Sequence, residues 1–125
     1  MISKVIAAER GQRAEKAVAV HLEQQGYRVC TANYSVPRLG ELDLVVSKDN
    51  SLTVVEVKAR SRSGAFGGLP FTITPAKLRR LRQATSCYLK QYNMLNVDVS
   101  FLAAFVQMDF AGNIIEISTV PVEWL

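Results

Sequence analysis

Two apolar segments joined by a short polar turn restrict the fold of this chain more than any other feature of its sequence. Residues 41–46 and 52–58 are rich in valine and leucine, and Lys48-Asp49-Asn50 between them has turn character. This arrangement predicts an antiparallel hairpin whose strands lie in the interior of a sheet. Interior strands need further elements to cover both faces of the sheet.

Two segments with helical periodicity lie before and after the hairpin. Residues 3–25 form the first and end at Gly26, a typical helix-terminating residue. Thr74 and Pro75 suit the N-cap and first position of the second helix, which is expected to extend to about Tyr92. The stripes expected to face the core are Ala8, Gly11, Val18 and Leu22, flanked by Ala14 and Ala19, and in the second helix Leu78, Leu81, Thr85, Tyr88 and Tyr92.

The remaining segments predict strands and one loop. Residues 27–33 suit a pleated sheet, residues 97–108 and 114–120 predict a hairpin, and the glycine-rich residues 61–72 predict a loop. The order helix, three strands, helix, two strands predicts one α/β domain over residues 1–125. We expect a sandwich around a mixed central sheet, with the second helix as the crossover between strands.

Residue usage excludes several kinds of chemistry. His21 is the only histidine, so histidine-rich metal sites and two-histidine ribonuclease mechanisms are excluded, and we expect it to be a partly exposed helical side chain. Cys30 and Cys87 lie far apart in segments expected to be buried, which predicts reduced thiols. No apolar run reaches the length of a signal peptide or membrane span, so the expected location is the cytoplasm, without membrane contact. Because histidine-based sites are excluded and the cysteines are expected to be buried, any catalytic chemistry must depend on carboxylates and lysine.

Acidic side chains interrupt the apolar pattern at three places. Glu15 falls near the middle of the first helical stripe, where a carboxylate needs a cation, a hydrogen-bond network or a metal. The alternative is a shifted helix face that leaves Glu15 at the rim. Glu56 and Lys58 lie two residues apart on one strand and therefore emerge side by side, and Asp43 lies on the neighbouring strand.

Together these side chains predict a site for a hard cation. We expect the two strands to present Asp43, Glu56 and Lys58 on one face, with Glu15 approaching from a helix packed over it. The alternative for Glu56 and Lys58 is a solvated ion pair at a strand end. Mg²⁺ or Mn²⁺ held by Asp43 and Glu56 would polarise a phosphate and lower the pKa of a bound water. Lys58 would orient that nucleophile or offset charge on the phosphorus.

The runs Gly40-Glu41-Leu42-Asp43-Leu44 and Val55-Glu56-Val57-Lys58-Ala59-Arg60 carry a family resemblance. They resemble the YraN-like family of predicted bacterial endonucleases, which belongs to the restriction-endonuclease-like superfamily and is related to Holliday-junction resolvases. The resemblance implies that Asp43 and Glu56 bind metal and that Lys58 is the catalytic lysine. It also implies that Glu15 completes the catalytic site from the first helix.

Basic residues follow the acidic motifs. No Asp or Glu lies between Val57 and Val97, so the basic residues of this segment are not offset by acidic ones. A phosphodiester substrate needs a basic surface of this kind beside a metal pocket. The helix start near Thr74 adds free N–H groups for phosphate. The residues expected to contact nucleic acid are Arg60, Arg62, Lys77, Arg79 and Arg80, although a solvated helix face is the usual role of residues such as Arg79.

These features predict a Mg²⁺- or Mn²⁺-dependent endonuclease acting on branched or otherwise non-sequence-specific DNA, with a homodimer as one option. No recognition-helix signature is present, so the expected contacts are to phosphate. Two alternatives stay open. One is a non-catalytic nucleic-acid-binding or partner-docking module that retains the fold, and the other is a metal-dependent hydrolase of small molecules.

Overall fold

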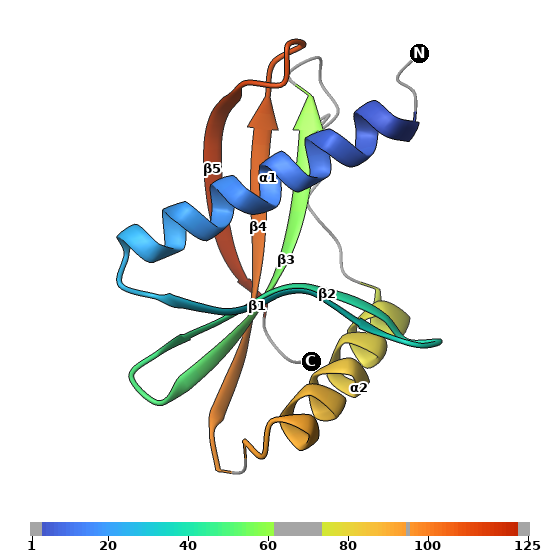
Figure 1. Cartoon of the computed structure of the whole chain (residues 1–125), viewed down its shortest axis with the longest axis vertical. Helices are drawn as coiled ribbons and strands as arrows, with labels where there is room; N and C mark the ends of the chain where they lie inside the picture. Colours follow the sequence, from blue (N-terminus) through green and yellow to red (C-terminus); the bar gives the residue numbers. More distant parts are fainter. Residues whose placement is uncertain (1–3, 62–73, 95, 123–125) are drawn as a thin grey trace.

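The computed structural model describes residues 4–61, 74–94 and 96–122, which form two helices and one five-stranded sheet. Along the chain the elements follow the order helix, three strands, helix, two strands (Figure 1). The expected α/β class with a mixed sheet is confirmed. The elements are α1 (Lys4–Gln24), β1 (Arg28–Val36), β2 (Gly40–Lys48), β3 (Ser51–Ser61), α2 (Pro75–Gln91), β4 (Asp98–Met108) and β5 (Ile114–Val122).

The strands lie side by side in the same order as in the sequence. β1, β2 and β3 are antiparallel neighbours, as are β4 and β5. β3 and β4 run parallel, with α2 between them in the chain, so the predicted crossover is confirmed. The predicted hairpin of residues 41–46 and 52–58 is confirmed as β2 and β3, and both strands extend beyond the expected bounds.

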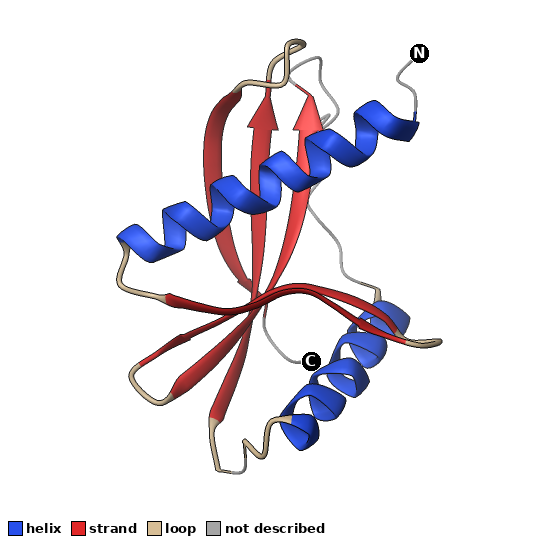
Figure 2. Ribbon diagram, in the orientation of Figure 1, coloured by secondary structure: helices blue, strands red, loops and turns tan. Residues whose placement is uncertain are grey.

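Each helix covers one face of the sheet. Ala14, Val18 and Leu22 of α1 pack with Val55 in one buried cluster. Leu81, Ala84 and Tyr88 of α2 pack with Val54 in another cluster. Because Val54 and Val55 are consecutive strand residues, they point to opposite faces, and the two helices therefore lie on opposite sides (Figure 2).

The helix ends follow their sequence signals. Gly26 has φ +96°, and its N–H donates to the Glu23 carbonyl, while the Tyr27 N–H donates to the Leu22 carbonyl, each at 3.0 Å. This Schellman pattern ends α1, and Lys48 Nζ donates to the Gln25 carbonyl at 2.8 Å. At the start of α2, Thr74 Oγ1 accepts from the Lys77 N–H at 3.1 Å, so the predicted N-cap is confirmed.

Both predicted helical stripes need correction. In α1, Ala14 is fully buried and Ala8 is exposed, so the buried face is rotated away from the predicted one. In α2, Ala84 is buried, whereas Leu78 is only half-buried and Tyr92 is 48% exposed at the C-cap. The contacts of a helix with a strongly twisted sheet decide which small residues it buries.

Other sequence expectations have mixed outcomes. Cys30 and Cys87 are free as expected, but both are half-buried rather than buried. His21 is half-buried and lies 3.2 Å from Gln25 Nε2, in agreement with its predicted role on the helix surface. No helix among the described residues is long and apolar enough to span a membrane. Most of the loop predicted at residues 61–72 lies outside the described residues, and Ser61 ends β3.

Candidate functional site

The candidate site lies where β2 and β3 separate. Their ladder runs from Lys48 opposite Ser51 to Leu44 opposite Val55. Beyond that point β2 continues only beside β1, and β3 continues beside β4. The sheet therefore divides into a β1–β2 arm and a β3–β4–β5 part, which diverge in Figure 1.

Asp43 lies at this branch point. Its Oδ2 accepts a hydrogen bond from the Val57 N–H at 2.8 Å. This N–H faces the position that β2 would occupy if its ladder with β3 continued. The carboxylate therefore supplies the hydrogen-bond acceptor that a neighbouring strand would otherwise provide. The hydrogen bond holds Asp43 in the gap between the two parts of the sheet.

Three carboxylates converge on one side of the gap. Glu15 from α1, and Glu41 and Asp43 from β2, each offer an oxygen atom, and these atoms lie within 4.8 Å of one another. With its NH₂ group turned toward them, the Asn33 amide donates to Glu15 Oε1 at 2.8 Å and to Glu41 Oε1 at 2.7 Å. Asn33 has φ +56°, a left-handed conformation that asparagine tolerates better than most residues. We call Glu15, Glu41 and Asp43 the acidic trio.

Burial and nearby negative charge raise the pKa values of two carboxyl groups of the acidic trio. Burial, and then the neighbouring charge of Glu56, raise the pKa of Asp43 to about 7, although the Val57 hydrogen bond opposes this. Burial and the charge of Glu41 raise the pKa of Glu15. Both carboxyl groups therefore hold protons more strongly than free side chains do, and a nearby cation would relieve this repulsion.

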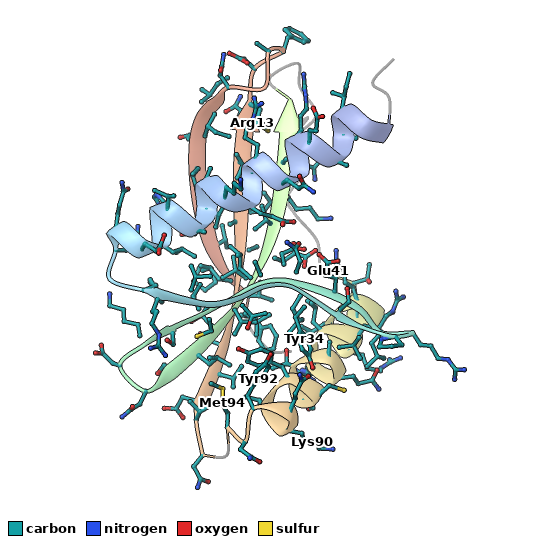
Figure 3. The ribbon with its side chains drawn as sticks, viewed as in Figure 1. Arg13, Tyr34, Glu41, Lys90, Tyr92 and Met94 are labelled. Atoms are coloured by element: carbon teal, nitrogen blue, oxygen red, sulfur yellow. The ribbon has the colours of Figure 1, made fainter. Side chains whose placement is uncertain are left out.

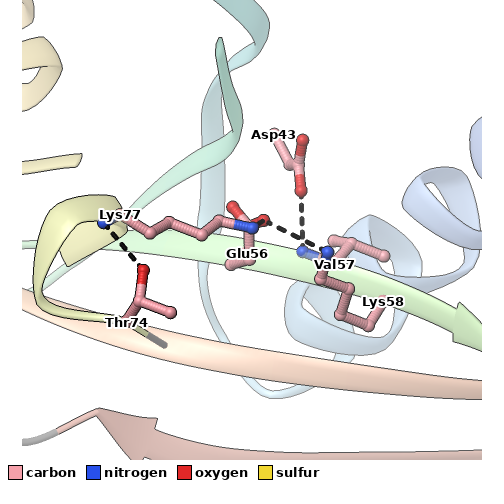
Figure 4. A network of polar contacts seen from close by, with 6 residues as sticks. All are labelled: Asp43, Glu56, Val57, Lys58, Thr74 and Lys77. Atoms are coloured by element: carbon pink, nitrogen blue, oxygen red, sulfur yellow. Dashed lines mark hydrogen bonds and ion pairs between the residues drawn. The ribbon is translucent and has the colours of Figure 1, made fainter. Parts of the chain in front are cut away.

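Glu56 lies on the other side of the gap, among lysines. Its Oε1 is 2.7 Å from Lys77 Nζ on α2 and 4.0 Å from Lys58 Nζ (Figure 4). The Glu56 side chain is only 12% exposed, whereas each lysine side chain is 36% exposed. The short ion pair with Lys77 therefore offsets part of the charge of Glu56, and Lys58 is a more distant neighbour.

The two lysines have opposite pKa shifts. Burial opposes the charge on Lys77, but its hydrogen bond with Glu56 and the charge of Glu56 outweigh this and raise its pKa. Burial and the adjacent charge of Lys77 lower the pKa of Lys58. Lys58 is therefore the lysine of this pair that gives up its proton more easily.

A pocket of about 420 Å³ opens between the β1–β2 arm and the start of α2. Residues of the candidate site and side chains of α2 line it together, and we call it the α2 pocket. It is lined by Leu39, Gly40, Glu41, Glu56, Thr74, Lys77, Arg80, Leu81 and Ala84.

The basic residues expected to contact nucleic acid have different surroundings. Arg79 and Arg80 are exposed on α2, and Arg80 lines the α2 pocket. Arg60 is half-buried near the end of β3. Lys77, expected on a phosphate surface, has Glu56 as its partner. Arg62 lies outside the described residues.

The structure differs from the expectation that the helix carrying Glu15 packs over the face that presents Glu56 and Lys58. Glu56 and Lys58 point to the same side of β3 as Val54, which packs under α2. Glu15 belongs to α1, which lies on the other face of the sheet. Asp43 reaches both groups because it occupies the gap between them. Because the helix face is rotated, Glu15 lies beside the buried stripe and is half-buried, as in the rim alternative.

Sequence reasoning missed two members of this arrangement. Glu41 is not among the predicted catalytic residues, although its spacing from Asp43 places both on one face of a strand. Figure 3 shows Glu41 on the α1 side of the β1–β2 arm and Tyr34 on the α2 side. Asn33 is not among the predicted site residues, and only the fold shows that it bridges two carboxylates.

The donor set of the acidic trio fits a hard divalent cation. Carboxylate oxygens are the preferred protein ligands of Mg²⁺ and Mn²⁺. Three such oxygens lie close together, and burial and the charge of Glu56 raise the pKa of Asp43. Glu56 is near enough to raise the Asp43 pKa, although its shortest contact is with Lys77.

Comparisons with known proteins agree on one family. The family model of the uncharacterised protein family UPF0102 matches residues 14–109, which span the acidic trio, Glu56, Lys58 and Lys77. A UPF0102 protein of Syntrophomonas wolfei is 39% identical over 93 residues, covering 74% of this chain and 79% of the relative. One from Neisseria meningitidis serogroup C is 31% identical over 117 residues, covering 94% and 91%. One from Dechloromonas aromatica is 45% identical over 80 residues, covering 64% and 65%.

Proposed function

This chain belongs to the uncharacterised protein family UPF0102, the YraN-like family that its motifs resemble, and we propose that it is a divalent-metal-dependent endonuclease. Its substrate in this proposal is DNA, branched or otherwise bound without sequence readout, in the cytoplasm. The proposal includes a restriction-endonuclease-like architecture in a single domain. The observed order of helices and strands supports that architecture.

The branch-point position of Asp43 is the observation that carries this proposal. A carboxylate bound to the Val57 N–H stands between an acidic trio and a Glu56–Lys58–Lys77 group. A structural ion-pair network would balance its charges locally. Here the acidic side instead has an excess of carboxylates, and burial and Glu56 raise the Asp43 pKa to about 7.

In the proposed site, Glu15, Glu41 and Asp43 hold Mg²⁺ or Mn²⁺. The bound cation would supply Lewis-acid stabilisation of charge on the phosphate. Asn33 positions two of these ligands through its amide hydrogen bonds. Glu56 stands across the gap and adds negative charge that favours cation binding.

Lys58 is the proposed catalytic lysine. Burial and the charge of Lys77 lower its pKa, so it exchanges a proton more readily than an exposed lysine does. Its ammonium would stabilise negative charge that develops on the phosphate, and in its neutral form it would accept a proton from the attacking water. Arg79 and Arg80, exposed on α2, would hold the phosphodiester backbone without reading bases.

Plasmid nicking in Mn²⁺ or Mg²⁺ tests the proposal, with wild-type protein compared to Glu15→Gln and Lys58→Ala. The matched control is Glu23→Gln, which makes the same charge change at an exposed position of the same helix. We expect nicking by the wild type and by Glu23→Gln, and a loss of at least about 100-fold in the two site variants. Equal nicking by all four proteins would indicate contamination and would reject the enzyme proposal.

One observation favours the second candidate, a non-catalytic nucleic-acid-binding module. Glu56 is engaged with Lys77 at 2.7 Å, which in such a module would be a permanent structural ion pair. This candidate predicts salt-dependent DNA binding with no metal-dependent cleavage. A gel shift across ionic strength, run beside the nicking assay, distinguishes the two. The small-molecule hydrolase alternative predicts neither DNA binding nor nicking.

A further inference from the structure

We propose that the α2 pocket binds one unpaired nucleotide of the substrate. This inference rests on the proposed function, because it assigns to the pocket the strand that enters the candidate site. The two are joined by Glu41, which lines the pocket and also belongs to the acidic trio. A nucleotide in the pocket would therefore place its neighbouring phosphate beside the carboxylates.

The size of the pocket selects a single nucleotide. Its volume of about 420 Å³ lies at the low end of the range of roughly 300–1,000 Å³ that is typical of small-molecule sites. A base pair with its two backbones is too large for such a space. A nucleotide that is unstacked from a duplex, or part of a single strand, is of suitable size.

The pocket combines an apolar floor with two cations and with the carboxylates of Glu41 and Glu56, of which Glu56 is paired with Lys77. Leu39, Leu81 and Ala84 supply apolar surface suited to a sugar or the face of a base. Lys77 and Arg80 supply positive charge, and the Arg80 side chain makes no hydrogen bond or ion pair with any residue of the described ranges 4–61, 74–94 and 96–122. An exposed guanidinium at a pocket lip is well placed to bind a phosphate.

The lining also predicts what the pocket does not recognise. It contains no aromatic side chain and no asparagine, glutamine or histidine among the described residues. Strong stacking of a base on an aromatic ring is therefore not expected, which favours similar binding of purine and pyrimidine nucleotides. This agrees with a substrate chosen by its unpaired structure rather than by its sequence.

Calorimetric titration of the full chain in EDTA tests the pocket, with dAMP, dCMP and inorganic phosphate as probes. Arg80→Gln removes one positive charge at the pocket, and Gln83→Glu lowers the net charge equally at an exposed position of α2 outside it. We expect similar affinities for dAMP and dCMP, at least about a fivefold loss in Arg80→Gln, and less than about a twofold loss in Gln83→Glu. Equal losses in these two variants would reject the pocket as the binding site.

The apolar floor has its own test. Leu39→Ala should weaken dAMP binding about threefold and leave the binding of inorganic phosphate unchanged, because only the nucleotide contacts the floor. If phosphate binds the wild type as tightly as dAMP does, the pocket is an anion site and the nucleotide proposal is wrong. The titration in EDTA measures nucleotide binding separately from metal-dependent cleavage. Nucleotide binding by a protein that does not nick DNA in Mn²⁺ or Mg²⁺ would reject the endonuclease proposal and support the pocket proposal. Nicking without nucleotide binding would reject the pocket alone.

Discussion

The β2–β3 pair has a closed half and an open half, and the two differ in almost every physical respect. In the closed half, from Leu44 opposite Val55 to Lys48 opposite Ser51, the ladder is continuous. Four of its side chains, Leu44, Val45, Val46 and Val55, are at most 1% exposed. In the open half the strands have different partners, and Asp43 and Glu56 are carboxylates beside the gap.

The difference shows how one hairpin serves two purposes. An uninterrupted ladder between two covered faces leaves no room for charge, because each buried charge must find a partner. Where the ladder ends, the Val57 N–H needs a partner and Asp43 provides it. The same break admits Glu15 from one face and Lys77 from the other, so that charge from both sides meets at one point.

The largest expected effect is the loss of proposed activity in Asp43→Asn. The substituted amide can still accept from the Val57 N–H, but the site loses its central charge. Loss of Lewis-acid stabilisation worth several kcal/mol corresponds to a decrease in nicking rate on the order of 10⁴-fold. Single-turnover nicking in Mn²⁺ measures this decrease. A rate within tenfold of the wild type would mean that the open half is not a catalytic site.

The same variant should have a different pH dependence of stability in EDTA. The Asp43 pKa is raised to about 7, so the folded wild type holds this proton between about pH 4 and 7 while the unfolded chain releases it. Wild-type stability should therefore fall relative to Asp43→Asn as pH rises through this window, by up to roughly 4 kcal/mol. Chemical denaturation of both proteins from pH 4.5 to 8 measures the difference. Parallel stability curves would contradict the raised pKa.

In the closed half, Leu52→Ala should affect stability alone. Leu52 is 1% exposed in the cluster under α2, and truncation of a buried leucine costs about 2–5 kcal/mol. Calorimetric melting should show this loss, and Mn²⁺ affinity measured by electron paramagnetic resonance below the melting range should be unchanged. A large change in Mn²⁺ affinity would show that the two halves are not independent.

The smallest expected effect concerns Lys77. Lys77→Met removes the 2.7 Å ion pair of Glu56 and leaves more negative charge at the gap. In the absence of nucleotide we expect Mn²⁺ to bind about three- to tenfold more tightly, with Lys90→Met, at an exposed position near the end of α2, as the charge-matched control. Weaker Mn²⁺ binding would mean that Lys77 positions Glu56 for the metal rather than competing with it.

The closed half was predictable from the sequence, and the open half was predictable only in part. Apolar strand residues and the turn at Lys48-Asp49-Asn50 predicted the hairpin, and Asp49 and Asn50 have left-handed φ values of 51° and 54°. The spacing of Glu56 and Lys58 predicted their shared side of the sheet. These are local properties, and strand periodicity or turn chemistry expresses them directly.

The branch itself has no local signal. Which residues end the β2–β3 ladder depends on how strongly the sheet twists under its two helices, which is a property of the whole fold. The rotated face of α1, which leaves Glu15 beside the stripe, has the same origin. The pairing of Glu56 with Lys77 depends on the crossover that brings α2 back over the sheet. Whether the site binds metal and cuts DNA stays a prediction.

The connectivity of the site has a consequence for how the chain folds. Asp43 and Val57 are 14 residues apart, whereas the contact of Arg13 with the Gly112 carbonyl joins residues 99 apart. Short loops close at lower entropic cost, so the hairpin gathers Asp43 and Glu56 before the crossover delivers Lys77. Refolding should therefore meet charge repulsion early, and we expect millimolar Mg²⁺ to speed refolding more than an equal ionic strength of NaCl does. Stopped-flow circular dichroism with and without Mg²⁺ would show whether repulsion between these carboxylates limits the refolding rate.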